Sequence, residues 1–310
     1  MIAVALFEHW LHALAWGRCF TLPHRPGPGR LLGAYLAGGA INLLTPTATL
    51  GGELVRGALA PRGVPATERV ASVTADRLAM SLADTLIGLA GFGVLVVAAP
   101  LSPLARAAVA VGALLFGSGV AIFFELQRRG RLASFFGERR LVRALLGRHL
   151  ADRIAAGSRE VDGRLAAFHR ERAGDLRAAF GLHLAGTSVG ALQLALFFAW
   201  LGDAVSPRAI LTVFSVSIAL DLFSFFVPAR LGAQEGARML AMSLAGLDPA
   251  RGLLFSLVLR AEQLLWAGVG LVAYAAIAAR DRTARVAPAA REVEHDGRPA
   301  REVAGGGGPC

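Results

Sequence analysis

Two short segments of this sequence carry acidic and basic side chains inside otherwise apolar runs. In each, a glutamate follows a proline by seven residues and an arginine follows the glutamate by three: Pro46, Glu53 and Arg56 in the first, Pro228, Glu235 and Arg238 in the second. An arginine guanidinium binds phosphate or carboxylate through paired N–H donors, and a glutamate three positions away on a helix can neutralise it. A proline breaks a helix, and backbone amides freed at a helix start favour anions. These residue types therefore predict a binding site for an anionic group and not a set of catalytic groups.

The similarity between the two segments extends beyond the charged pairs. An arginine follows each pair by 21 or 22 residues, as Arg77 and Arg260, and the turn Gly63-Val-Pro65 returns as Gly246-Leu-Asp-Pro249. The offset between the two copies is 182 to 184 residues. Paired interrupted segments in the two halves of a membrane chain point to a substrate site between the halves. We therefore expect an internal repeat whose broken segments meet at one cavity.

The elements that must position these residues are membrane-spanning helices. Of the 310 residues, 55% are hydrophobic and 17% are charged, which is below the usual quarter of a soluble domain. Mean hydropathy is +0.55, and several apolar runs reach about 18 to 25 residues, the length that crosses a bilayer. The sequence predicts an all-α polytopic membrane protein with about six to eight transmembrane helices and two broken or re-entrant segments. The net charge of +10 comes from arginines, which we attribute to cytoplasmic loops and anionic headgroups and not to nucleic acid.

Composition divides the chain into four parts. Residues 1–126 form a first transmembrane half with the broken motif 42–56, and residues 177–279 form a second half with the broken motif 225–238. Between them, residues 127–176 hold twelve arginines against six acids, with apolar residues at helical spacing. This pattern predicts a basic amphipathic insert on the cytoplasmic surface, or alternatively a solvated insert. Residues 280–310 are polar and are expected to be disordered.

Smaller features complete these expectations. Residues 2–20 are interrupted by Glu8, His9 and His12 and predict a short or partly interfacial helix, in which Trp10 and Trp16 suit the membrane interface. His183 lies inside an apolar span, where a lone hydrogen-bonded histidine is the simpler interpretation. No His/Cys/Asp spacing predicts a metal site, no P-loop predicts ATP binding, and two cysteines cannot form a disulfide framework. We therefore expect neither a metal nor a cofactor.

Five motifs of this sequence together resemble one known family. They are Asn42-Leu-Leu-Thr-Pro46, Gly52-Glu53-Leu-Val-Arg56, Asp76-Arg77, Val227-Pro228-Ala-Arg-Leu-Gly232-Ala-Gln-Glu235-Gly236 and Arg260. This family is the transmembrane, "flippase-like" region of lysylphosphatidylglycerol synthases, and the Gly-Gly-Glu and Gln-Glu-Gly forms look most like its hopanoid-biosynthesis branch. The resemblance implies a multi-pass protein of the bacterial inner membrane that flips or transports lipids. It departs from the family pattern at Arg230, where a glycine is common. The aminoacyl-transferase domain of bifunctional relatives, and hence lysyl transfer, is not expected.

Three hypotheses follow for the function. The first is a lipid transporter or flippase-like protein, without enzymatic activity, that binds an anionic phospholipid or a hopanoid between two repeats. The second is a membrane-embedded enzyme acting on lipid headgroups, in which Asp76, Asp84 and Asp221 converge. The third is a scaffold that docks lipid-biosynthesis proteins on residues 127–176. For the first hypothesis the expected substrate-binding residues are Asn42, Pro46, Gly52, Glu53, Arg56, Asp76, Arg77, Pro228, Gly232, Glu235, Arg238 and Arg260.

Overall fold

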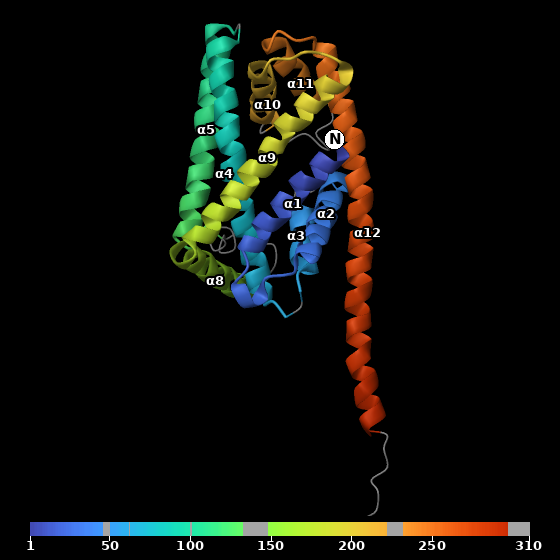
Figure 1. Ribbon diagram of the computed structural model, residues 1–310. Helices are drawn as coiled ribbons and strands as arrows, with labels where there is room; N and C mark the ends of the chain where they lie inside the picture. The colour runs from blue at the N-terminus through green and yellow to red at the C-terminus, as the bar shows by residue number, and fades with distance from the viewer. Residues whose placement is uncertain (46–49, 62, 100, 133–147, 222–231, 297–310) are drawn as a thin grey trace, which may run out of the picture.

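The computed structural model describes residues 1–45, 50–61, 63–99, 101–132, 148–221 and 232–296, and within these ranges the regular structure is helical. The helices are α1 (Ile2–Arg18), the short η1 (Leu22–His24), α2 (Pro28–Leu44), α3 (Leu50–Leu59), α4 (Ala66–Ala98), α5 (Pro103–Arg128), α8 (Arg148–Glu171), α9 (Ala173–Leu201), α10 (Pro207–Asp221), α11 (Ala233–Leu244) and α12 (Pro249–Asp296). Figure 1 shows α10 and α11 at the end of the bundle opposite α8. The all-helical class predicted from the sequence is confirmed.

Long apolar helices form the frame of the bundle. Among the described residues, four helices are long and apolar enough to cross a membrane, namely α4, α5, α9 and α12. Helices α1 and α2 have 17 residues each and α10 has 15, so each is about 23 to 26 Å long, which is shorter than the about 30 Å thickness of the hydrocarbon core. Large apolar side chains on α5, including Leu104, Leu114 and Ile122, are exposed, as expected for a surface that meets lipid and not water. These features agree with a polytopic membrane protein.

The predicted breaks lie between short packed helices. Helix α2 ends at Leu44 and Thr45 is extended, after which α3 begins at Leu50 and packs back against α2. In the second half α10 ends at Asp221, and α11 begins at Ala233 and packs against α10. Pro46 and Pro228 themselves lie outside the described residues. Each predicted broken segment therefore separates a longer helix from a shorter helix that folds back beside it.

Helices from the two halves pack on each other in a reciprocal way. Helix α2 lies against α12, which Figure 1 shows side by side, and α10 lies against α4. A side chain on Gly270 would collide with the carbonyl oxygen of Leu36, and one on Gly91 would collide with that of Ser215. Leu36 and Ser215 are 179 positions apart, and so are Gly91 and Gly270. The same close glycine contact between helices is therefore made twice, with the halves exchanged.

The structure describes parts of the two polar regions, the insert and the tail. Helix α8, from the predicted basic insert, packs on α4 and α5 and buries Val161, Leu165 and Phe168, so its apolar face belongs to the protein core. Residues 133–147 of that insert lie outside the described part of the chain. The tail that was expected to be disordered from residue 280 continues α12 as a helix to Asp296, and residues 297–310 lie outside the described residues.

Candidate functional site

The first broken segment is held by a close approach of two helices. Gly52 lies in the first turn of α3, and its backbone N–H donates to Asn42 Oδ1 of α2 over 2.7 Å. A Cβ at position 52 would collide with the carbonyl oxygen of Gly38 and with the Asn42 side chain. The amide of Asn42 therefore satisfies one of the backbone donors that a helix start leaves unpaired. Glycine is required here because any larger residue separates α3 from α2.

The charged pair on α3 is divided between two partners on α4. Arg56 is buried, and its Nη2 donates to Asp76 Oδ2 over 2.5 Å. Its guanidinium lies 4.6 Å from the ring centroid of Trp16 and 4.9 Å from that of Tyr35. Glu53 Oε1 forms an ion pair with Arg77 Nε at 3.3 Å. The expected mutual neutralisation of Glu53 and Arg56 is therefore replaced by ion pairs from each of them to α4.

The second broken segment shows a related arrangement. Gly232 has a φ of 78°, a conformation that favours glycine, and its N–H donates to Glu235 Oε2 over 2.8 Å at the start of α11. Glu235 Oε1 in turn accepts from Arg260 Nη2 of α12 at 2.9 Å. Arg238 Nη2 lies 3.8 Å from Asp221 Oδ2, and its Nη1 lies 3.5 Å from Ser256 Oγ. In both halves, then, the glutamate after the break pairs with the arginine of the next long helix.

A single cavity of about 1340 Å³ is bordered by both halves of the chain. Four of the expected site residues, Asn42, Arg77, Arg238 and Arg260, line it. Carboxyl groups line it as well, and they are those of Glu8, Asp84, Asp221 and Glu262. The wall contributed by α5 is apolar and includes Leu115, Phe116 and Phe123. The cavity thus combines three guanidinium groups with a surface suited to hydrocarbon.

The other expected site residues that the structure describes do not line this cavity. They make ion pairs and backbone contacts next to its lining residues, or they border a second pocket. Arg56 and Asp76 are buried against each other, and Glu235 holds Arg260. Glu53 and Arg77 border a second pocket of about 510 Å³. Gly52 and Gly232 shape the starts of α3 and α11 and supply backbone donors. The structure therefore brings the charged residues of each half together, and three of the four expected arginines, Arg77, Arg238 and Arg260, line the cavity.

Sequence reasoning missed a buried polar row next to this site. His183 Nε2 lies 2.8 Å from Asp76 Oδ1, and His183 Nδ1 lies 2.7 Å from His12 Nδ1. His183 is therefore not a lone histidine. Trp16, which was expected at the membrane interface, is fully buried beneath Arg56. The available signal was the spacing of Glu8, His12 and Trp16, which at intervals of four residues share one face of α1.

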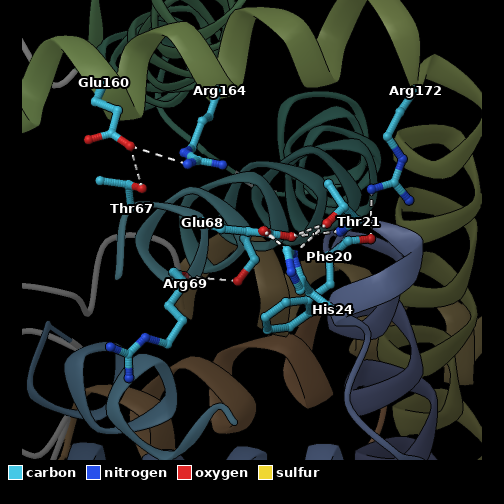
Figure 2. A network of polar contacts seen from close by, with 10 residues as sticks. Phe20, Thr21, His24, Thr67, Glu68, Arg69, Glu160, Arg164 and Arg172 are labelled. Carbon is cyan, nitrogen blue, oxygen red and sulfur yellow. Dashed lines mark hydrogen bonds and ion pairs between the residues drawn. The ribbon is translucent and has the colours of Figure 1, made fainter. Parts of the chain in front are cut away.

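A separate polar network fixes the end of the bundle near α8, as Figure 2 shows. Glu68 accepts hydrogen bonds from the backbone N–H of Thr21 at 2.9 Å and from its hydroxyl at 2.5 Å, and it lies 2.7 Å from His24 Nδ1. On α8, Glu160 accepts from the hydroxyl of Thr67 at 2.8 Å and from Arg164 at 3.2 Å, and these hydrogen bonds lower the pKa of Glu160. The network ties the link after α1 and the helix α8 to the start of α4.

Comparison with known proteins gives one positive finding. A family model described as the lysylphosphatidylglycerol synthase TM region matches residues 1–279. No curated protein and no solved structure matched the chain. The matched range includes both broken segments, the cavity and the helices that border it. The chain therefore belongs to the family of the lysylphosphatidylglycerol synthase TM region, which relates it to membrane proteins of lipid metabolism or transport.

Proposed function

We propose that this protein moves an amphiphilic lipid across the bacterial inner membrane and binds its polar headgroup in the cavity between the two halves. The observation that carries the proposal is the cavity itself, because arginines from both halves, Arg77 in the first and Arg238 and Arg260 in the second, line one space of about 1340 Å³. Charged side chains in a membrane are costly and mark substrate pathways when they face such a space. The family supports a role in lipid metabolism or transport.

The reciprocal packing supports a transport mechanism. The ion pairs Glu53–Arg77 and Glu235–Arg260 occupy corresponding places in the two halves, and the glycine contacts between α2 and α12 and between α10 and α4 correspond as well. We interpret the chain as two related repeats. Transporters built from such repeats bind substrate between them and expose it to alternate sides when one repeat moves against the other.

The chemistry of the cavity fits a lipid with an anionic headgroup. Guanidinium groups bind phosphate through paired hydrogen bonds, and a headgroup phosphate would compete with the carboxylates that now contact these arginines. The longest of these contacts joins Arg238 and Asp221, at 3.8 Å. Acyl chains would lie along the apolar wall of α5, whose residues include Leu115, Phe116 and Phe123. Anionic phospholipids and hopanoids with charged headgroups are the candidate substrates.

The enzymatic alternative receives less support from the same geometry. Asp84 and Asp221 line the cavity, but Asp76 is buried between Arg56 and His183. The three carboxylates that were expected to converge in a catalytic centre therefore do not all face one space. For this reason we propose transport without covalent change of the lipid.

A flipping assay tests the proposal. The purified full chain is reconstituted in vesicles that contain a fluorescent phosphatidylglycerol, a fluorescent phosphatidylethanolamine or a labelled hopanoid, and the outer label is quenched chemically. Loss of one charge-assisted contact, at about 1.5–3 kcal/mol, predicts that Arg238→Gln slows flipping of the anionic lipid by about tenfold or more. The control is Arg208→Gln, which removes an exposed arginine at the start of α10. Equal flipping by wild type, both variants and empty vesicles would overturn the proposal.

A further inference from the structure

Five ionisable side chains from four helices, three of the first half and α9 of the second, form a continuous row inside the bundle. From the cavity inward, Glu8 Oε1 lies 3.8 Å from His12 Nε2, and His12 Nδ1 lies 2.7 Å from His183 Nδ1. His183 Nε2 then lies 2.8 Å from Asp76 Oδ1, and Asp76 Oδ2 accepts from Arg56 at 2.5 Å. Asp76 and His183 have no exposed surface. The row therefore joins the cavity wall on α1 to the helix α3 that follows the first break.

The hydrogen bonds of this row assign its protons. Arg56 stays charged, and a buried guanidinium needs a buried counter-charge, so Asp76 is a carboxylate that can only accept. His183 must therefore carry its proton on Nε2, and the lone pair of a neutral His183 lies on Nδ1. His12 has to donate from its own Nδ1 to this lone pair. The Nε2 of a neutral His12 is then the unprotonated ring nitrogen and lies on the side of Glu8, and both residues line the cavity.

The surroundings of His12 leave room for its ring and place acidic groups near it. Gly186 of α9 makes this room, because a Cβ there would lie 2.9 Å from Cε1 of the ring. Tyr35 stacks on the other side, with ring centroids 5.9 Å apart. The charged and titratable groups around His12 are Glu8 and His9 on α1, Tyr35 on α2, Asp84 on α4 and His183 on α9. Glu262 of α12 interacts electrostatically with Glu8.

We propose that His12 is a proton-binding site in the cavity wall and that it relays the positive charge to His183, beside the Asp76–Arg56 pair. The proton enters on Nε2 of His12, and the proton on its Nδ1 moves across the 2.7 Å contact to Nδ1 of His183. His12 is left neutral with its proton on Nε2, and His183 becomes a cation. One proton is gained, and only N–H bonds form or break.

The arrival of the proton changes the contacts of α3. Asp76 then faces two cations, the His183 imidazolium and the Arg56 guanidinium, and divides its charge between them. Arg56 therefore binds Asp76 less strongly, and this ion pair is one of the contacts that hold α3 against α4. Coupling of proton uptake to lipid movement rests on the proposed function, whereas the proton site rests on the geometry of the row alone. In this way a proton gradient across the membrane would drive a change in the contacts of α3 next to the cavity.

Nitrogen-15 NMR of histidine-labelled full chain in lipid bilayers tests the proton site. At about pH 8 we expect His12 protonated at Nδ1 only and His183 at Nε2 only, and between about pH 8 and pH 5 the two rings should take up one proton together. In His12→Asn, whose amide can still donate to His183, the signals of His183 should no longer change with pH. His169→Asn is the control, because it removes a histidine of α8 outside the row. The wild-type spectra alone overturn the proposal if His12 carries its neutral proton on Nε2 or if the pair takes up no proton.

The flipping assay, repeated across the same pH range, tests the coupling. We expect the wild-type rate to change severalfold with pH and the His12→Asn rate to be flat. A wild-type rate independent of pH would overturn the coupling. Vesicles in which no lipid moves, combined with a histidine pair that takes up a proton, would overturn the proposed function and support the proton site.

Discussion

Replacement of Asp76 by asparagine tests whether the buried ion pair holds the first half together. The change keeps the size of the side chain but removes its charge. Arg56 would then remain buried as a guanidinium without its counter-ion, although its contacts with Trp16 and Tyr35 would persist. His183 would lose the carboxylate that fixes its orientation. We therefore expect a large loss of stability from a substitution that creates no cavity.

The size of this loss follows from burial. Removal of one partner of a buried ion pair costs about 3–5 kcal/mol. The carbonyl oxygen of the new amide can still accept one hydrogen bond, which returns about 1 kcal/mol. The expected net loss is about 2–4 kcal/mol. In the double variant Asp76→Asn with Arg56→Met the unpaired charge is gone, so this variant should lose less stability than Asp76→Asn alone.

Unfolding of the purified protein in mixed micelles, followed by circular dichroism, measures these differences. The matched control is Glu125→Gln, because Glu125 makes ion pairs of similar length, 2.8 and 2.6 Å to Arg128 and Arg129, at an exposed site. Exposed pairs contribute little, so this control should leave the unfolding curve almost unchanged. Equal destabilisation by Asp76→Asn and Glu125→Gln would refute the reasoning from burial.

Further predictions concern helix packing and pH. Gly91→Ala should lower the free energy of unfolding by about 1–3 kcal/mol, because its Cβ would collide with the backbone of α10, whereas Gly93→Ala, with open space around it, should be neutral or slightly stabilising. Similar unfolding curves for the two variants would contradict the close contact. Hydrogen bonds from Thr67 and Arg164 lower the pKa of Glu160 in the folded state. They therefore stabilise the α4–α8 contact at pH values above 4.5, the ordinary pKa of the group in the unfolded chain, and this stabilisation is lost as the pH falls through the lowered pKa of the folded state. Proteolysis of α8 should therefore increase with acidification in the wild type, and Glu160→Gln should remove this dependence; an unchanged dependence in the variant would argue against the assignment.

The two charged segments could be recognised from the sequence because their residue spacing is local. Proline, glycine and charge inside an apolar run are rare in a plain spanning helix, so their recurrence identified both helix breaks and the matching arginines Arg77 and Arg260. The same reasoning failed for partners distant in the chain. Glu53 and Arg56 share a helix face, which suggested that they pair with each other, but α4 offers each of them a closer partner.

The buried row illustrates why such partners could not be predicted. His12 and His183 are 171 positions apart, and only the packing of α1 against α9 makes them neighbours. The apolar character of residues 2–20 was correctly seen, but amphipathic periodicity does not reveal whether a helix faces lipid, headgroups or protein. For this reason Trp16 was expected at the interface and is instead buried under Arg56.

The sequence by itself determined the helical membrane class, the two interrupted segments and the residue types able to bind an anion, because hydropathy, helix breaks and charge are properties of neighbouring residues. Only the tertiary structure decided which carboxylate neutralises which arginine, that arginines of both halves line one cavity, and that two histidines connect this cavity to Asp76. These are contacts between helices, and their identity depends on the direction and register of packing, which no local pattern contains.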